Sequence, residues 1–149
     1  MILLKIIIFY LILLPSAYYD LKKMIIPDIL TFTGILTGLL FVFLGEKEYY
    51  LFYLIGGLSG FTITYLTAVI GKHLLKKEIL GGGDIKLITV IGLFTGYPGL
   101  LIIILMSSLI GIFIIIFIYK DTSRPIPYGF YLASSAIVVS PFLNILNLT

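Results

Sequence analysis

At residues 81–87 the chain reads Gly-Gly-Gly-Asp-Ile-Lys-Leu, which places three glycines, an acid and a base at the start of an apolar run. Residues 88–96 carry no charge. A carboxylate beside a membrane-spanning stretch is costly unless it has a partner or a function. The second acid in such a position is Asp20, at the end of the first apolar run. We therefore interpret the rest of the chain as a frame that brings Asp20 and Asp84 together on one side of a membrane.

The composition predicts an integral membrane protein. Of the 149 residues, 60% are hydrophobic and 11% are charged, and the mean hydropathy is +1.20, whereas soluble domains are roughly half apolar and a quarter charged. The net charge of +3 is small, and the basic residues lie in short loops. This pattern suits membrane orientation better than nucleic-acid binding. The chain has no cysteine and one histidine, His73. We therefore expect no metal site, no cofactor and no nucleic-acid partner.

Apolar stretches separated by short polar breaks predict an all-α bundle of six transmembrane helices in a single domain, residues 1–149. We expect the spans at 2–19, 29–44, 49–71, 84–96, 100–119 and 128–146. Tyr97-Pro98-Gly99 is interpreted as a tight turn between the fourth and fifth spans. An alternative for the first stretch is a cleaved signal peptide ending near Pro15-Ser16-Ala17, although the proline and the scarcity of charge fit that poorly.

Glycines spaced four residues apart within the predicted spans indicate close packing of helices, because small residues let two helix backbones approach each other. We interpret these glycines as packing positions rather than ligand sites. They are Gly34, Gly38, Gly56, Gly60, Gly92 and Gly96.

The distribution of basic residues predicts the orientation, because Lys and Arg gather on the cytoplasmic side. With the N-terminus outside, the inner loops hold Lys22, Lys23, Lys72, Lys76, Lys77, Lys120 and Arg124. The outer side then holds only Lys5 and Lys47. In this topology Asp20, Asp84 and the turn at residues 125–129 all lie at the cytoplasmic face of a multi-pass protein of the cell membrane.

Ionisation of both carboxyl groups within hydrogen-bond reach of each other is electrostatically unfavourable, so one of them keeps a proton. Such a pair offers a base that takes a proton from water and an acid that protonates a carbonyl oxygen or a leaving amine. The alternative is structural: Asp84 caps a helix, and Asp20 is an interfacial charge beside Lys22 and Lys23. Spacing alone leaves both interpretations open. Asp28 follows Pro27 and is interpreted as a helix cap.

Three motifs resemble those of the type IV prepilin peptidases and archaeal preflagellin peptidases. Residues 81–87 match Gly-x-Gly-Asp-x-Lys-Leu. Residues 20–31 resemble an Asp followed by Ile/Leu-Pro-Asp/Asn and Leu-Thr. Ile126-Pro127-Tyr128-Gly129 resembles a late Ile-Pro-Phe-Gly turn, with Tyr in place of Phe. The order of the motifs agrees with the family, and the resemblance spans essentially the whole chain.

The resemblance implies an aspartic endopeptidase without cofactor or metal that cleaves the leader of type IV prepilins or pre-archaellins at the cytoplasmic membrane face. Its partners would be that substrate protein and membrane lipid, and the oligomeric state stays open. Asp20 and Asp84 match the two catalytic aspartates. The matched supporting positions are Gly81, Gly83, Lys86, Pro27, Asp28, Pro127 and Gly129. We expect Lys86 either to lower the pKa of one aspartate or to fix its geometry.

Departures from the family pattern lead to a further expectation. Many bacterial members carry an additional N-terminal stretch with a cysteine-based zinc site and also N-methylate the product. No cysteine is present here, so we expect a peptidase without a zinc or methyltransferase extension. The rival functions are a proton-coupled transporter that uses the two aspartates, a Gly-x-Gly-Asp intramembrane protease with other substrates, and a catalytically silent assembly protein.

Overall fold

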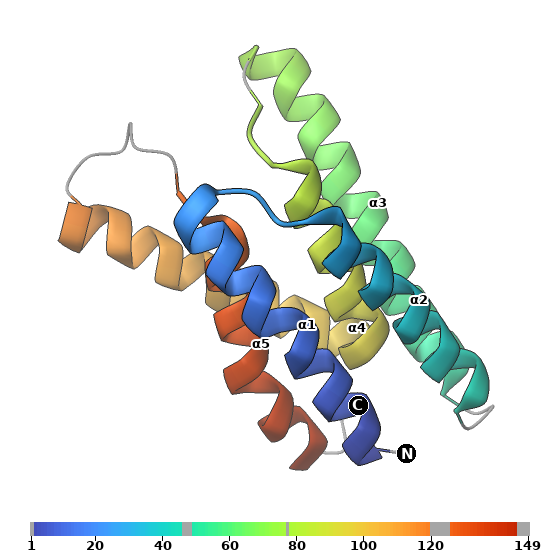
Figure 1. The fold of residues 1–149 in the computed structure, drawn as a ribbon. Helices are drawn as coiled ribbons and strands as arrows, with labels where there is room; N and C mark the ends of the chain where they lie inside the picture. Colours follow the sequence, from blue (N-terminus) through green and yellow to red (C-terminus); the bar gives the residue numbers. More distant parts are fainter. Residues whose placement is uncertain (1, 46–48, 77, 120–125, 146–149) are drawn as a thin grey trace.

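A computed structural model describes residues 2–45, 49–76, 78–119 and 126–145 of the chain. Within these residues the fold is entirely helical (Figure 1). Its elements are α1 (Ile2–Lys23), α2 (Asp28–Leu44), α3 (Tyr50–Leu75), α4 (Gly82–Phe113), the π-helix η1 (Ile114–Tyr119) that continues α4, and α5 (Tyr128–Ile145). Three helical stretches are long and apolar enough to cross a membrane: Leu3–Lys23, Tyr50–Leu75 and Gly82–Ile118. This agrees with the predicted membrane character.

The prediction of six transmembrane helices is wrong, because the described residues form five α-helices. The expected fourth and fifth spans belong to one element, α4, which is bent at Gly96. Gly96 has φ 71° and ψ 177°, a conformation that L side chains rarely adopt. The ring of Phe52 lies where a Cβ of Gly96 would be. Helix resumes after this break, so Pro98 can lie inside α4, and Tyr97-Pro98-Gly99 is a bend rather than a loop.

The first half of α4 forms the centre of the fold. Helix α4 packs against α3, α5 and α2, and α1 packs against α5 and α2. In the second half of α4, Leu143 of α5 lies beside Gly99 and Tyr131 of α5 lies beside Gly111. Figure 1 shows α1 beside α5, and α3 running along α4. The side chains that fill the middle are fully buried and aliphatic: Leu13, Leu87, Ile88, Ile91, Leu100, Ile103, Leu132 and Leu143. The helix that carries Asp84 is therefore held from several sides.

The predicted packing role of the glycines is confirmed. A Cβ on Gly92 would collide with the backbone of Gly56, and a Cβ on Gly56 would lie 2.5 Å from the carbonyl oxygen of Gly92. On α2, a Cβ on Gly34 would lie 2.8 Å from a methyl carbon of Val90. Helix α3 thus meets α4 backbone against backbone, and α2 packs on side chains of α4 at a distance that leaves no room for a side chain at Gly34.

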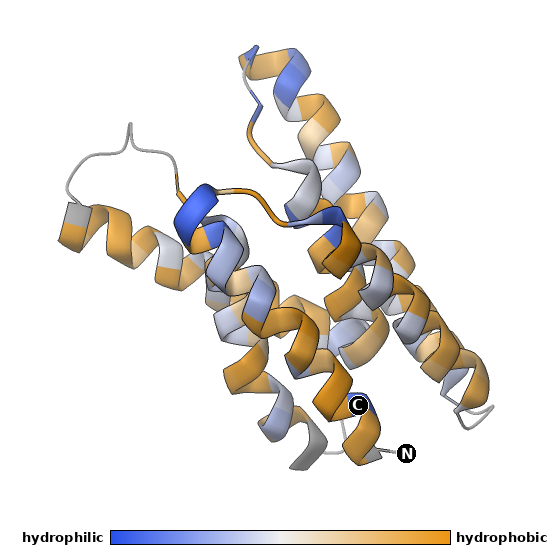
Figure 2. Cartoon of the chain, in the orientation of Figure 1, coloured by the Kyte–Doolittle hydropathy of each residue, from blue (hydrophilic) through white to orange (hydrophobic). Residues whose placement is uncertain are grey.

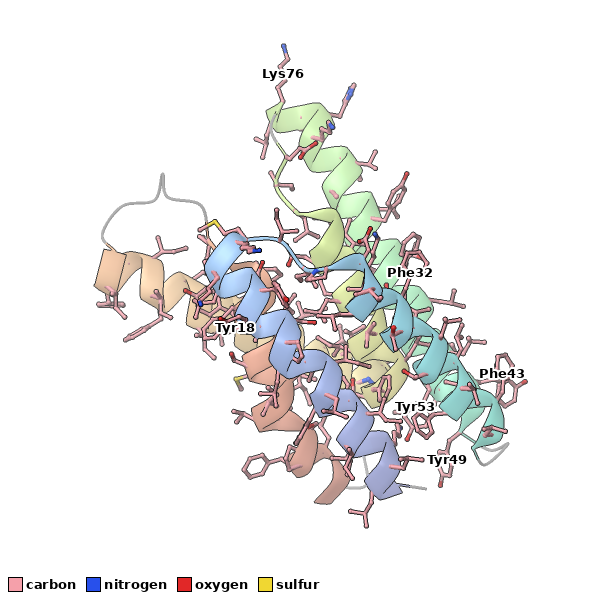
Figure 3. The ribbon with its side chains drawn as sticks, in the orientation of Figure 1. Tyr18, Phe32, Phe43, Tyr49, Tyr53 and Lys76 are labelled. Carbon is pink, nitrogen blue, oxygen red and sulfur yellow. The ribbon has the colours of Figure 1, made fainter. Side chains whose placement is uncertain are left out.

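Polar residues gather at one end of the fold. Figure 2 shows hydrophilic residues at the end of α1, the start of α2 and the end of α3, and mostly apolar residues along the helices. Lys76 lies at the tip of α3, at the opposite end from Tyr49 and Phe43 (Figure 3). Of the basic residues used to predict orientation, Lys47, Lys77, Lys120 and Arg124 lie outside the described residues.

Candidate active site

Asp20 lies in the last turns of α1. The helix continues through the expected polar break to Lys23, and the N–H of Met24 donates to the carbonyl oxygen of Asp20 at 2.8 Å. Met24 then takes a left-handed conformation with φ 52°, which ends the helix. The Asp20 residue is only 4% exposed. Its carboxyl group therefore points into the protein and not toward the solvent.

Asp84 lies in the first turn of α4. Gly81 is the N-cap of that helix, and the carboxylate of Asp84 accepts a hydrogen bond from the backbone N–H of Gly81. An acid in the first turn that reaches back to the N-cap N–H is a common way to satisfy a helix N-terminus. Helix capping therefore accounts for one contact of the Asp84 carboxylate. It does not account for the second oxygen, Oδ1, which lies beside Gly129 of α5.

The two acids meet at the start of α5. The N–H of Phe130 donates to Oδ2 of Asp20 at 2.8 Å, and the N–H of Gly129 also donates to this carboxylate. A Cβ built on Gly129 would lie 2.9 Å from Oδ1 of Asp84 and 3.1 Å from Cγ of Asp20. The bare α-carbon of Gly129 therefore has both carboxyl groups against it. Helices α1, α4 and α5 each contribute one part of this arrangement.

Oδ1 of Asp84 is buried and has no hydrogen-bond partner within the described part of the chain. A buried polar atom without a partner is costly, and here the Asp20 carboxyl group lies beside the same Cβ position of Gly129. A shared proton or a water molecule would satisfy it. Among the described residues, no group of three or more His, Cys, Asp or Glu side chains could hold a metal ion.

The three glycines before Asp84 have different surroundings. A Cβ on Gly83 would lie 3.1 Å from Cβ of Ile26, and one on Gly81 would lie 3.2 Å from Oδ2 of Asp84. A Cβ on Gly82 would meet nothing within 4 Å. Gly81 and Gly83 therefore have neighbours that a side chain would disturb, whereas Gly82, the variable position of the motif, has open space.

Lys86 does not contact the acid pair through any described interaction, and its ammonium group lies 2.6 Å from Oδ1 of Asp28. Pro27 is the N-cap of α2, and no side chain makes a capping hydrogen bond there. The carboxylate of Asp28, in the first turn, instead links α2 to α4. Pro127 is buried just before α5 begins.

Two parts of the site carried no signal in the sequence. The backbone N–H of Phe130 binds Asp20, but a main-chain donor leaves no trace in residue type. Ile26 is 5% exposed and lies against both Gly83 and Gly129. One isoleucine among many could be found only through its place beside Pro27 in the second motif.

The sequence is similar to a known family and to named relatives. Residues 7–116 match the model of the type IV leader peptidase family. The chain is similar to proteins named prepilin leader peptidase/N-methyltransferase: 36% identical to that of Aeromonas hydrophila over 82% of this chain and 43% of the relative, and 33% identical to that of Xanthomonas campestris over 85% and 46%. The protein of that name from Vibrio cholerae is 31% identical over 68% and 40%.

The chain thus spans less than half the length of these curated relatives. No solved structure matches it. The family model covers most of the chain and includes both Asp20 and Asp84. The chain therefore belongs to the type IV leader peptidase family.

Proposed function

We propose that this protein is an aspartic endopeptidase that removes the leader peptide of type IV prepilins or pre-archaellins. The observation that carries the proposal is the meeting of Asp20 and Asp84 at Gly129, where Oδ1 of Asp84 is buried without a described partner. Family membership supports a peptidase. The relatives are named prepilin leader peptidase/N-methyltransferase, which supports a prepilin as the substrate.

The proposed reaction needs one proton shared by the two carboxyl groups. The ionised carboxyl takes a proton from water as the water oxygen bonds to the carbonyl carbon, and the protonated carboxyl gives its proton to the carbonyl oxygen. The tetrahedral intermediate then collapses: the C–N bond breaks, and the amine nitrogen takes up the proton that came from water. One hydroxyl group of the intermediate returns its proton to the carboxylate that had donated one, which leaves the new carboxyl product and restores the shared proton of the pair. The N–H groups of Phe130 and Gly129 hold Asp20 while this happens.

The supporting residues act on the geometry of this pair. Gly129 leaves room between the carboxyl groups, and Gly81 donates to Asp84 through its backbone. Gly83 lets Ile26 approach the start of α4. Pro127 precedes the turn of α5 that supplies the donors to Asp20, and Pro27 begins the helix that carries Asp28.

We further propose that this end of the protein faces the cytoplasm from the cell membrane. Lys22 and Lys23 lie one turn beyond Asp20, and Lys72 and Lys76 lie at the end of α3. Basic residues at one end of a membrane protein favour the cytoplasmic side. Cleavage at this face would release the leader and leave the hydrophobic segment of the substrate in the membrane.

The test is leader cleavage by purified protein in liposomes, with a panel of prepilins and pre-archaellins as substrates. We expect Asp20→Asn and Asp84→Asn each to lose more than about 1,000-fold in rate, as expected when an acid–base group is removed. Glu78→Gln is the matched control, because Glu78 is an exposed acid whose pKa is lowered by its hydrogen bond with Lys72. Activity that survives either aspartate change would reject the pair.

A substrate other than a prepilin or pre-archaellin gives a different result in the same assay. No leader in the panel would then be cut, while an unrelated transmembrane peptide would be cut in an aspartate-dependent way. Proton flux in liposomes without any cleavage would favour a transporter. The same four proteins, wild type and three variants, distinguish these outcomes.

A further inference from the structure

The segment between α1 and α2, residues 24–27, begins and ends at residues linked to the site. Its first residue, Met24, donates its N–H to the carbonyl oxygen of Asp20 at 2.8 Å. Its last, Pro27, is the N-cap of α2 with φ −59°. Proline fixes φ near this value. The segment is therefore short; its first residue is hydrogen-bonded to the residue that carries the acid on α1, and its last has a fixed φ at the start of α2.

Ile26, in the middle of this segment, lies between the two helix starts that form the site. A Cβ on Gly83 of α4 would be 3.1 Å from Cβ of Ile26, and a Cβ on Gly129 of α5 would be 2.6 Å from its Cδ1. The residue is 5% exposed and belongs to the main apolar core. Ile26 thus fills the space that separates the first turns of α4 and α5.

An ion pair joins the end of the same segment to α4. The ammonium group of Lys86 lies 2.6 Å from Oδ1 of Asp28, and the side chains are 33% and 68% exposed. Lys86 is two residues beyond Asp84, and Asp28 is two residues beyond Ile26. Exposed ion pairs add little to the stability of a protein. The ion pair instead matters because it fixes the start of α2 relative to the first turns of α4.

We propose that residues 26–28 act as a clasp, in which the Asp28–Lys86 ion pair keeps Ile26 between α4 and α5 and so positions Asp84 against Asp20. Ile26, Asp28 and Lys86 are positioning residues and take no part in proton transfer. The inference rests on the proposed function for its catalytic readout, but it also makes a prediction about structure alone.

The first experiment measures cleavage by Lys86→Met, Asp28→Lys, Lys86→Asp and the reversed pair Asp28→Lys/Lys86→Asp. We expect each single change to lower kcat by about 10- to 100-fold with KM within about threefold, because displacement of a reacting group by about 1 Å costs roughly 100-fold. The reversed pair should recover at least about tenfold over the weaker single variant, since attraction is restored. Lys86→Arg should keep most of the activity.

The matched control is the other described ion pair, Lys72–Glu78, which is also exposed and has a length of 2.9 Å but joins the end of α3 to residue 78 and involves no residue of the proposed clasp. Lys72→Met and Glu78→Gln should cleave within about twofold of wild type. Thermal unfolding in detergent shows which variants are folded. Equal losses in both pairs would overturn the clasp and show a non-specific effect of removing surface charge. No recovery in the reversed pair would also overturn it and point to a direct role of the Lys86 charge.

The second experiment needs no substrate. The chain contains no cysteine, so cysteines introduced at the exposed positions Ile25 and Leu66 can carry spin labels without background. We expect one narrow distance distribution that broadens with Lys86→Met and stays unchanged with Lys72→Met. A distribution unaffected by Lys86→Met would refute the clasp even if wild-type protein cleaved no leader. Broadening without any cleavage would keep the clasp and reject the proposed function.

Discussion

Replacing Gly129 with alanine should inactivate the protein while leaving it folded. The added Cβ would lie 2.6 Å from Cδ1 of Ile26, 2.9 Å from Oδ1 of Asp84 and 3.1 Å from Cγ of Asp20, whereas ordinary contacts begin at 3.4 Å. Two of these three atoms, in Ile26 and Asp84, are ends of side chains, which can move by several tenths of an ångström. The carboxyl groups would therefore separate before the helices did.

The expected magnitudes differ for stability and activity. Overpacking costs about 1–3 kcal/mol, and alanine recovers about 0.5–1 kcal/mol of helix propensity over glycine, so the net loss of stability should stay near 1–2 kcal/mol. Displacement of an acid by about 1 Å should cost roughly 100-fold in kcat. Leader cleavage in liposomes measures the second quantity, and thermal unfolding in detergent measures the first.

Gly82→Ala is the matched control, because it makes the same change in the first turn of a helix where a Cβ would meet nothing within 4 Å. It should cleave at close to the wild-type rate. The double variant Ile26→Val/Gly129→Ala removes the clash with Cδ1 but leaves the crowding of the acids, so it should remain inactive. Recovery in that double variant, or more than half of wild-type activity in Gly129→Ala, would refute the reasoning.

Three further predictions concern packing, helix ends and methyl transfer. Gly92→Ala places a Cβ against the backbone of Gly56, and no side-chain rotation relieves that contact. The variant should lose more than about 3 kcal/mol of stability and give little folded protein in detergent. A normal yield and a normal melting temperature would contradict this. Met24→Gly relieves a left-handed residue with φ 52° and should stabilise the protein by about 1 kcal/mol with cleavage unchanged, as a shift in the thermal midpoint would show. Because the chain has no cysteine for a thiolate zinc site, purified protein should cleave a prepilin without transferring label from S-adenosylmethionine, and labelled product would refute this.

The sequence was sufficient to find the two acids but not the way they are held. Asp20 and Asp84 could be identified because charges are rare beside apolar stretches and because each lies in a motif. Their common end followed from the distribution of lysines. The Asp28–Lys86 ion pair joins residues far apart in the chain, and no local pattern predicts such a contact. The interpretation of Asp28 as a cap used only its immediate neighbours.

The error in the number of helices has a local cause. Tyr97-Pro98-Gly99 has the composition of a turn, and turn propensity cannot distinguish a loop from a bend within one helix. The choice is made by tertiary contacts: Phe52 from α3 covers Gly96 at the break, and Leu143 from α5 lies beside Gly99 just after it. These contacts come from helices that are remote in sequence, so a sequence window around Gly96 does not contain them.

The hydrogen bond from the N–H of Phe130 to Asp20 has a consequence for mutational surveys. The donor belongs to the polypeptide backbone, so nineteen genetically encoded residues supply it and only proline removes it. An alanine scan would report only the packing of the Phe130 ring against the core, while the atom that restrains Asp20 stayed in place. Proline is tolerated in the first turn of a helix, so a single proline at this position would expose a contribution that every other substitution conceals.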